Sequence, residues 1–205
     1  MRAIILNGHG GVDALGYVEN FPDPECGKDD VVVRVKSTSL NYHDIFTRNG
    51  MPGIKISMPM ICGLDVAGEI AEIGANVSGW KIGERVLIDP RNRVEGGLVG
   101  ETIHGGLAEY CRVKEHQLVR IPDGVSFDQA SSLPVAYGTA HRMMMTIGQV
   151  TSDDKILILG ASGGVGTGAL LLAKMAGAEV VVCASSDGKM EKLKSLGADH
   201  AMTYM

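Results

Sequence analysis

A glycine-rich turn between an apolar strand and a helix limits what this chain can fold into more than any other feature. The segment reads ILILGASGGVGTGALLLAKMAG and spans residues 156–177. Gly160 permits a tight turn, Gly163 leaves the backbone open to a pyrophosphate, and Gly166 lets the helix pack close to the strand. The N–H groups and positive dipole of the helix N-terminus favour phosphate there. The segment predicts a dinucleotide-binding unit, the alternative being a glycine turn in an unrelated strand–helix–strand unit.

The segments around this turn alternate between strands and helices. Apolar runs predict strands over 155–159, 179–183 and 200–204, and helices over 164–176 and 188–196 lie between them. That order is typical of a parallel, doubly wound sheet.

A longer helical stretch precedes the turn. Ser126 and Gln129 form a capping-box pattern, and the stretch that follows reaches about Ile147. Pro134 should break or kink this helix, because proline has no N–H group and its ring clashes with the preceding turn.

The first 125 residues have a different texture. Short runs of β type lie at 3–6, 31–37, 68–74, 84–88 and 107–113, with glycine turns between them. Several runs alternate polar and apolar residues, as half-buried strands do. The pattern predicts an antiparallel barrel or sandwich. One short helix is expected within residues 40–50, LNYHDIFTRNG, with Gly50 at its C-terminal end.

Composition excludes several classes of function. Lys and Arg number 19 and Asp and Glu 24, so the net charge is −5, and no basic stripe indicates a nucleic-acid partner. The four cysteines are far apart, which argues against a disulfide framework and a four-cysteine zinc knuckle. No apolar run is long enough for a signal peptide or a membrane span, so we expect no membrane partner and a cytoplasmic location.

The end of the second strand indicates which nicotinamide cofactor would bind. An acidic residue at this point binds the ribose 2′-hydroxyl of NAD, and a nearby cation admits a 2′-phosphate. Here Ser185 and Ser186 end the strand and Lys189 follows. Two hydroxyls and an ammonium suit a phosphate, so NADP(H) is favoured over NAD(H). Asp187 is the competing residue, and we interpret it as the N-cap of the next helix. The alternative for Lys189 is a solvated helix lysine.

Taken together, these stretches resemble the medium-chain dehydrogenase/reductase superfamily, which includes zinc alcohol dehydrogenases and quinone oxidoreductases. The resemblance rests on LNYHDIFTRNG, MICGLDVAGEIAEIGANVSGWKIGERV, GGLAEYCRV, LPVAYGTAHRM, GASGGVG and LGADH, in this order along nearly the whole chain. It implies an α/β plus β fold. A GroES-like antiparallel barrel would form the catalytic domain over 1–125. The first half of a Rossmann doubly wound parallel sheet would form a nucleotide-binding domain over 126–205, with its C-terminal half absent.

The resemblance also locates where zinc-dependent relatives hold their catalytic ion. The matching positions here are Asn41, Leu64 and Val135, and Asp65 stands where a companion carboxylate is found. A catalytic zinc needs about three protein ligands, and leucine and valine offer none. The segment 90–106, which matches the structural zinc lobe, contains no cysteine. No zinc is therefore expected, as in the zinc-free quinone and enoyl reductase branch.

For that branch the resemblance implies an NADPH-dependent oxidoreductase. Hydride would pass to a quinone or an activated C=C bond while the protein donates hydrogen bonds to the substrate carbonyl oxygen. The candidate catalytic residues are Asn41 at the matched position, Tyr42, and Asp44, which would accept hydrogen bonds that fix the cleft. His43 is a further candidate donor, and wall or surface roles are the alternative for Tyr42 and His43.

The resemblance places Thr139 against the nicotinamide. The candidate cofactor-binding residues from the turn, the strand end and the resemblance are Thr139, Gly160, Ser162, Gly163, Gly164, Val165, Gly166, Ser185, Ser186 and Lys189.

The chain covers only two strand–helix units of the dinucleotide fold, so we expect a fragment, a truncated product or a chain that a partner completes. Activity of the 205 residues alone is left open. The alternatives are a zinc-type alcohol dehydrogenase relative and a catalytically inactive nucleotide-binding or structural protein. The expected partner is a small carbonyl-conjugated or quinone substrate, and a homo-oligomeric state is left open.

Overall fold

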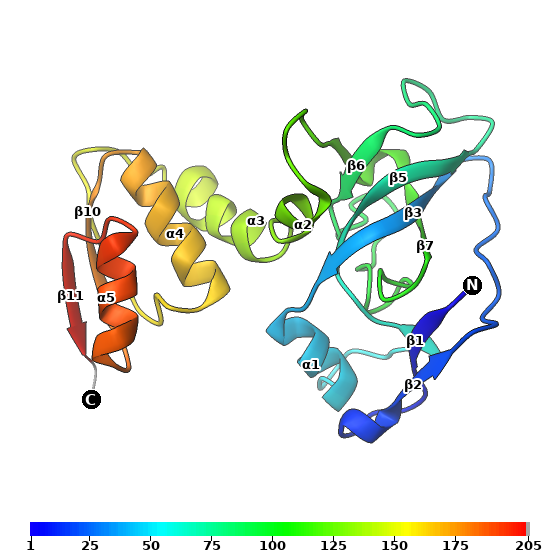
Figure 1. Cartoon of the computed structure of the whole chain (residues 1–205), viewed down its shortest axis with the longest axis horizontal. Helices are drawn as coiled ribbons and strands as arrows, with labels where there is room; N and C mark the ends of the chain where they lie inside the picture. Colours follow the sequence, from blue (N-terminus) through cyan, green and yellow to red (C-terminus); the bar gives the residue numbers. More distant parts are fainter. Residues whose placement is uncertain (204–205) are drawn as a thin grey trace. The chain divides into compact units, whose positions relative to one another are not determined.

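The computed structural model describes residues 1–203, which fall into two compact units (Figure 1). The units are Met1–Pro134 and Val135–Met205. The change in sequence texture at residue 125 lies nine residues before this boundary. The helix α2 (Phe127–Ser131) accounts for the difference, because it packs against strands of the first unit.

The first unit contains two antiparallel sheets. A five-stranded sheet has the order β7-β3-β5-β6-β8, and a three-stranded sheet has the order β2-β1-β4. The antiparallel architecture expected from the short β runs is confirmed. The strands are β1 (Ala3–Leu6), β2 (Leu15–Val18), β3 (Asp30–Ser39), β4 (Met60–Ile61), β5 (Asp65–Ile73), β6 (Arg85–Ile88), β7 (Tyr110–Lys114) and β8 (Leu118–Arg120). Three of them, β2, β4 and β8, were not predicted because they carry two to four residues and no clear alternation.

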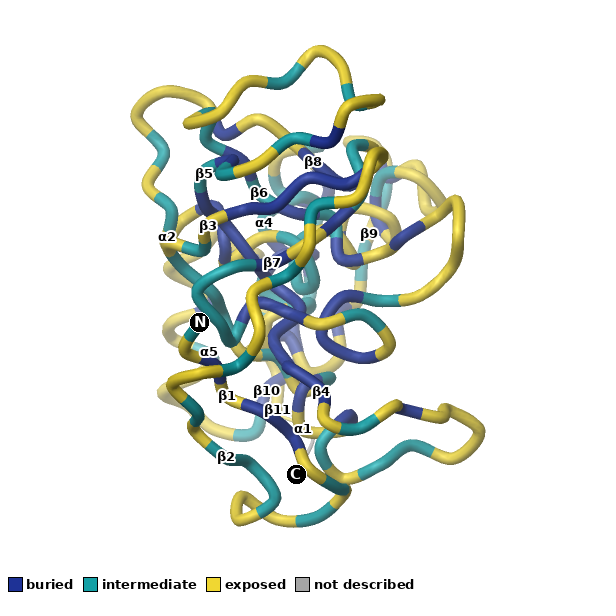
Figure 2. The backbone as a smooth tube through the Cα atoms, turned by 90° about the vertical axis from the view of Figure 1, so that its right-hand side faces the viewer, coloured by how far each residue is buried: buried dark blue, intermediate teal, exposed yellow. Residues whose placement is uncertain are grey.

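Alternating residues of β3, β5 and β6 build the core of this unit. Val31, Val33, Val66, Ile70 and Val86 are wholly or almost wholly buried in one cluster. Figure 2 shows that buried positions concentrate in the strands and that the connecting loops are largely exposed. Because side chains alternate across a strand, this pattern fixes which face of each strand meets the core.

The register between β3 and β5 has a consequence for function. The two strands are antiparallel, and the last residue of β3, Ser39, lies opposite the first residue of β5, Asp65. The helix α1 (Tyr42–Asn49) begins directly after β3, with Asn41 as its N-cap, and ends at Gly50, whose φ is 87°. The predicted short helix and its glycine C-terminus are confirmed.

The second unit is a parallel three-stranded sheet with helices packed against it. The order is β11-β10-β9, and both pairs of neighbours are parallel, as the sequence predicted. Buried side chains of the sheet, α4 and α5 share one core cluster, which includes Ile158, Leu170, Val182 and Leu193. The elements are α3 (Ala136–His141), β9 (Lys155–Ile158), α4 (Gly164–Met175), β10 (Glu179–Ala184), α5 (Asp187–Ser195) and β11 (His200–Thr203). Tyr204, included in the strand expected over 200–204, lies outside the described residues.

The helical stretch before the glycine turn divides as expected near Pro134. The capping box at its start is present: Gln129 N donates to Ser126 Oγ at 3.1 Å, and Ser126 N donates to Gln129 Oε1 at 2.9 Å. After α3 the chain continues as a π-helix, η3 (Arg142–Ile147), which the sequence did not predict. A π-helix has no separate sequence period, so its form depends on the packing around it.

The predicted N-cap of α5 is wrong by one residue. Ser186 is the N-cap, with extended backbone angles, and Asp187 is the first helical residue. Lys189 N and Met190 N both donate to the backbone oxygen of Ser186 at 3.1 Å. Asp187 therefore stabilises the first turn through its charge at the positive end of the helix.

Candidate functional site

A network of buried and half-buried polar side chains lies where β3, α1 and β5 meet in the first unit. Asn41 Nδ2 donates to Asp65 Oδ2 at 2.8 Å, and Ser39 Oγ donates to the same oxygen at 2.6 Å. Asp65 is completely buried. A buried carboxylate needs such donors, because burial without hydrogen bonds is costly. The sequence identified Asn41, whereas the roles of Ser39 and Asp65 follow from the strand register.

Asp44, another predicted residue, ties the same region to the chain before β5. Its Oδ2 accepts Asn41 N at 2.8 Å, and its Oδ1 accepts Gly63 N at 3.0 Å. Burial raises the pKa of the Asp44 carboxyl above its ordinary value, the two backbone hydrogen bonds oppose this, and the nearby charge of Asp65 adds to it. Asp44 therefore ties the start of α1 to the backbone at Gly63.

An apolar pocket opens beside this network. Its volume is about 270 Å³. Such a cavity, mostly apolar with a few polar groups, is typical of small-molecule sites. The residues that line it are Leu15, Leu40, Asn41, Tyr42, Asp44, Ile45, Arg48, Cys62 and Leu107. The three predicted catalytic residues all line this pocket. Its aliphatic residues were not predicted because they come from three separate segments, at Leu15, at Leu40 and Ile45, and at Leu107.

Cys62 in the pocket wall is not an activated thiol. Burial, with a contribution from the charge of Asp44, raises its pKa to about 11. The thiol stays protonated near neutral pH, and only a thiolate is a good nucleophile or metal ligand.

Tyr42 and His43 take different positions from Asn41. The Tyr42 side chain is largely exposed and its ring contacts Phe46, with 6.0 Å between the ring centroids. His43 Nε2 lies 2.7 Å from Glu101 Oε2, a pairing the sequence did not indicate because the residues are 58 positions apart. Asn41 and Asp44 are thus brought together by hydrogen bonds, and Tyr42 contributes an exposed wall.

In the second unit, the glycine turn leaves room for a ligand where the sequence expected it. A Cβ atom on Gly163, the N-cap of α4, would meet only Gly160 O, at 3.5 Å. A Cβ atom on Gly166 would lie 2.7 Å from Ala161 Cα and Gly160 O, so the helix packs directly on the turn. Gly160 has a φ of 63°, which favours glycine. The first N–H groups of α4, from Gly164, Val165 and Gly166, have no partners within the helix, so they fit a phosphate.

The remaining predicted cofactor residues also belong to the second unit. Lys189 Nζ donates to Ser185 Oγ at 3.0 Å, so an ammonium and a hydroxyl lie together after β10. Ser186 is exposed at the start of α5, Ser162 is exposed in the turn, and Thr139 is exposed on α3. Each of these residues carries a polar side chain.

The side chains present do not fit a catalytic zinc. Within residues 1–203, no group of three or more His, Cys, Asp or Glu side chains is arranged to hold a metal ion. Leu64, at the position matched to a histidine ligand, is a buried apolar side chain. A zinc site needs nitrogen, sulfur or oxygen ligands in tetrahedral array.

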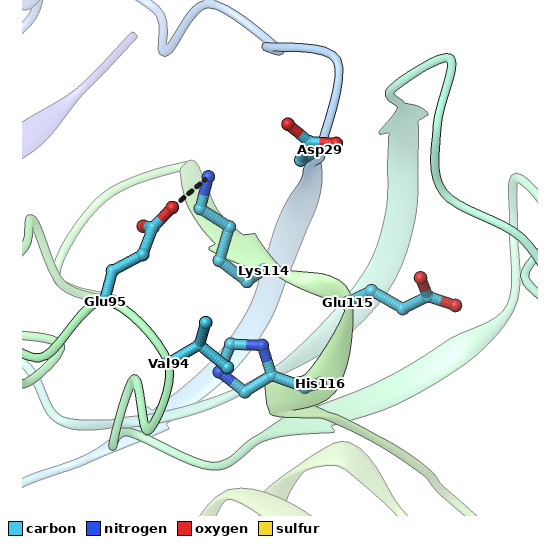
Figure 3. Close-up of a pocket in the computed structure, with 6 residues that line it drawn as sticks. All are labelled: Asp29, Val94, Glu95, Lys114, Glu115 and His116. Carbon is cyan, nitrogen blue, oxygen red and sulfur yellow. Dashed lines mark ion pairs between the residues drawn. The ribbon is translucent and has the colours of Figure 1, made fainter.

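A second hollow in the first unit has a different character (Figure 3). Its volume is about 530 Å³, and its lining consists of Asp29, Val94, Glu95, Lys114, Glu115 and His116. Lys114 Nζ lies 2.8 Å from Asp30 Oδ1 and 3.2 Å from Glu95 Oε1. Its central cation is therefore already paired, and the hollow lacks the apolar wall of the pocket beside Asn41.

Comparison with known families agrees with this architecture. Residues 27–123 match the family described as "Alcohol dehydrogenase GroES-like domain", and residues 164–205 match "Zinc-binding dehydrogenase". The chain belongs to the medium-chain dehydrogenase/reductase superfamily. Members of this superfamily use nicotinamide cofactors. The GroES-like antiparallel unit and the parallel, Rossmann-like unit occur here in the order typical of the superfamily.

Individual relatives support the same assignment. The chain is 35% identical over 206 residues to the chloroplastic NADPH-dependent alkenal/one oxidoreductase of Arabidopsis thaliana, covering all of this chain and 52% of that protein. It is 36% identical over 212 residues to the chloroplastic quinone-oxidoreductase QR1 of Triphysaria versicolor, covering all of this chain and 61% of the relative. A crystal structure of an NAD-dependent alcohol dehydrogenase superposes with a TM-score of 0.92 and 32% identity, covering 100% of this chain and 64% of the other.

The chain thus spans 52% to 64% of the length of these proteins. No helix in the described part of the chain is both long enough and apolar enough to cross a membrane.

Proposed function

We propose that this superfamily member binds NADPH and takes part in the reduction of an activated C=C bond or a quinone without a metal ion. The observation that carries the proposal is the side-chain amide of Asn41 in the wall of a largely apolar pocket. An N–H donor in an apolar cavity stabilises negative charge that develops on a carbonyl oxygen. Two of the relatives are named as an alkenal/one oxidoreductase and a quinone-oxidoreductase, which supports this class of substrate.

The bound cofactor would supply the hydride, and the residues of the chain would bind and orient. The glycine turn before α4 would hold the pyrophosphate, and Thr139 would contact the nicotinamide. In the first unit, Asn41 would donate to the substrate carbonyl, Asp44 would hold the backbone of Asn41, and Tyr42 would form a wall. We keep 1–125 as the catalytic domain and 126–205 as the nucleotide-binding domain within this proposal.

The test is oxidation of NADPH by the chain in the presence of 1,2-naphthoquinone or an α,β-unsaturated ketone. Asn41→Ala should lower kcat/KM by about 10²-fold, as expected for loss of one donor to a developing oxyanion. The Kd for NADPH, measured by fluorescence titration, should not change. Nucleotide binding without any turnover would instead favour the inactive nucleotide-binding alternative.

The preference for NADPH rests on Lys189 and Ser185. Their hydrogen bond places a positive charge after β10, where an ammonium suits a 2′-phosphate. Lys189→Ala should raise the Kd for NADPH about tenfold and leave the Kd for NADH unchanged, because a hydrogen bond to a charged group contributes about 1.5 kcal/mol or more. Lys192→Ala, on the same helix, is the matched control. An equal rise in the Kd for NADPH and for NADH would contradict the assignment of Lys189 to the 2′-phosphate.

A zinc-type alcohol dehydrogenase is the second candidate. The family description "Zinc-binding dehydrogenase" and the similar NAD-dependent alcohol dehydrogenase structure favour it. The lack of a suitable ligand group among residues 1–203 weighs against it. Elemental analysis of the purified chain separates the two, since stoichiometric zinc would revive this candidate. The cytoplasmic location stays a prediction.

A further inference from the structure

The carboxylate of Asp65 lies behind Asn41 and out of reach of solvent. Asp65 is completely buried, and it begins β5 opposite Ser39. Its Oδ2 accepts two hydrogen bonds, from Ser39 Oγ at 2.6 Å and from Asn41 Nδ2 at 2.8 Å. An ionised carboxylate has only acceptor atoms.

This acceptor decides which way the Asn41 amide can face. The nitrogen of an asparagine amide donates and its oxygen accepts, and the two are nearly equal in shape. Turning the amide by 180° would place Asn41 Oδ1 against Asp65 Oδ2, so two acceptors would meet in a buried place. Such an arrangement loses a hydrogen bond and leaves a buried charge less satisfied, which is unfavourable.

The N-terminus of α1 is compatible with the same orientation. The Asn41 side chain makes no capping hydrogen bond to the helix, because Asp44 N donates to the backbone oxygen of Asn41 at 3.1 Å. The Asn41 backbone N–H is held by Asp44 Oδ2 at 2.8 Å. With one N–H directed to Asp65, the second N–H of Asn41 is left for a ligand in the pocket that Asn41 lines.

We propose that Asp65 is a positioning residue that holds the Asn41 amide with its N–H toward the pocket, so that the pocket selects ligands with an acceptor-only carbonyl oxygen. This inference deepens the proposed function and rests on the same pocket. It differs from a general structural role because it predicts a specific change at the Asn41 amide when the acceptor at position 65 is removed.

The test is a nuclear magnetic resonance titration of the full chain with cyclohex-2-enone, without cofactor. The Asn41 side-chain amide resonances are assigned by their loss in Asn41→Ala. In the unsubstituted chain, one amide proton should be shifted downfield by the carboxylate and the other should move on addition of the enone. Asp65→Ala should abolish the downfield shift and raise the enone Kd at least fivefold. The double variant Asn41→Ala/Asp65→Ala should bind the enone no more weakly than Asn41→Ala alone.

Two further variants keep the test decisive. Thr38→Val removes a half-buried hydrogen bond of 2.6 Å to the backbone oxygen of Asp65. It therefore disturbs the structure at the same place, and it should leave enone binding unchanged. If Asp65→Ala does not fold, Asp65→Asn retains the shape but can present a donor or an acceptor, and it should give an intermediate loss. Unchanged Asn41 resonances and enone binding in a folded Asp65 variant would overturn the inference.

The same measurements separate this inference from the proposed function. Enone binding that depends on Asp65, in a chain that does not oxidise NADPH, would uphold the positioning role while the reaction fails. Turnover that depends on Asn41 but is unaffected by Asp65→Ala or Asp65→Asn would uphold the reaction and overturn the positioning role.

Discussion

Two glycines of the nucleotide turn differ in what a methyl group would meet. A Cβ atom on Gly166 would approach backbone atoms of Ala161 and Gly160 to 2.7 Å, and one on Gly163 would find its nearest neighbour at 3.5 Å. Gly166 is therefore needed for packing of the helix on the turn, whereas Gly163 leaves space for a ligand. Two glycines three residues apart thus have different roles, one in stability and one in binding.

We therefore expect opposite effects from the two alanine substitutions. Gly166→Ala should lower the free energy of unfolding by about 1–3 kcal/mol, because backbone atoms must shift. Gly163→Ala should change stability by less than about 0.5 kcal/mol and should weaken NADPH binding. Urea denaturation and nucleotide titration measure the two quantities. A Gly163→Ala chain that binds NADPH normally would contradict a phosphate site at this turn.

The Asp44 carboxyl should make stability depend on pH. Burial raises its pKa above the ordinary value of 3.8, so the folded state holds the proton more tightly than the unfolded state. The contribution of this raised pKa to the free energy of unfolding is complete below pH 3.8, and it is lost as the pH rises through the folded-state pKa. The difference in unfolding free energy between the natural chain and Asp44→Asn should decrease over that window. A carboxyl carbon titration with a midpoint below 3.8 would reverse the predicted sign.

Among the helices, α2 shows how a local signal determines a boundary. Ser126 and Gln129 satisfy each other's backbone N–H groups, and the helix packs on β3 and β5. Ser126→Ala should lower the free energy of unfolding of the first unit by about 1 kcal/mol, since the N-cap acceptor is lost. Ser57→Ala, at an exposed serine outside helices and strands, is the matched control. Equal midpoints in urea for both variants would show that the cap contributes nothing.

Sequence reasoning located such elements well where the signal is local. The capping box, the break at Pro134, the Gly50 terminus and the alternation of strands and helices in the second unit all depend on neighbouring residues. The strands β2 and β4 were missed because two to four residues carry too little periodicity. The N-cap of α5 was displaced to Asp187 because Ser186 and Asp187 are both good N-cap residues, and backbone geometry chose between them.

At the level of the whole chain, one face of the parallel sheet carries exposed apolar side chains. Leu157 and Met202 are 59% and 51% exposed, while Ile158 and Val182 are buried in the core with α4 and α5. Large exposed apolar patches promote association. We expect this chain to self-associate at high concentration, and Leu157→Thr should reduce it in sedimentation velocity. Met175→Thr, which removes an exposed apolar side chain from the end of α4, should not. Equal self-association of the two variants would contradict the role of this sheet face in association.

Adjacent residues were enough to predict the glycine turn and the antiparallel and parallel halves, because sterics and short-range periodicity depend on near neighbours. The resemblance to the superfamily pointed to Asn41 and Asp44. The surroundings of Asn41 could be known only from the folded chain. Asp65 lies 24 positions away in the chain and Ser39 lies 26 positions from Asp65, and the register of β3 against β5 brings the three side chains together. Registers depend on burial of whole strand faces, so a hydrogen bond across two strands has no local signature in the sequence.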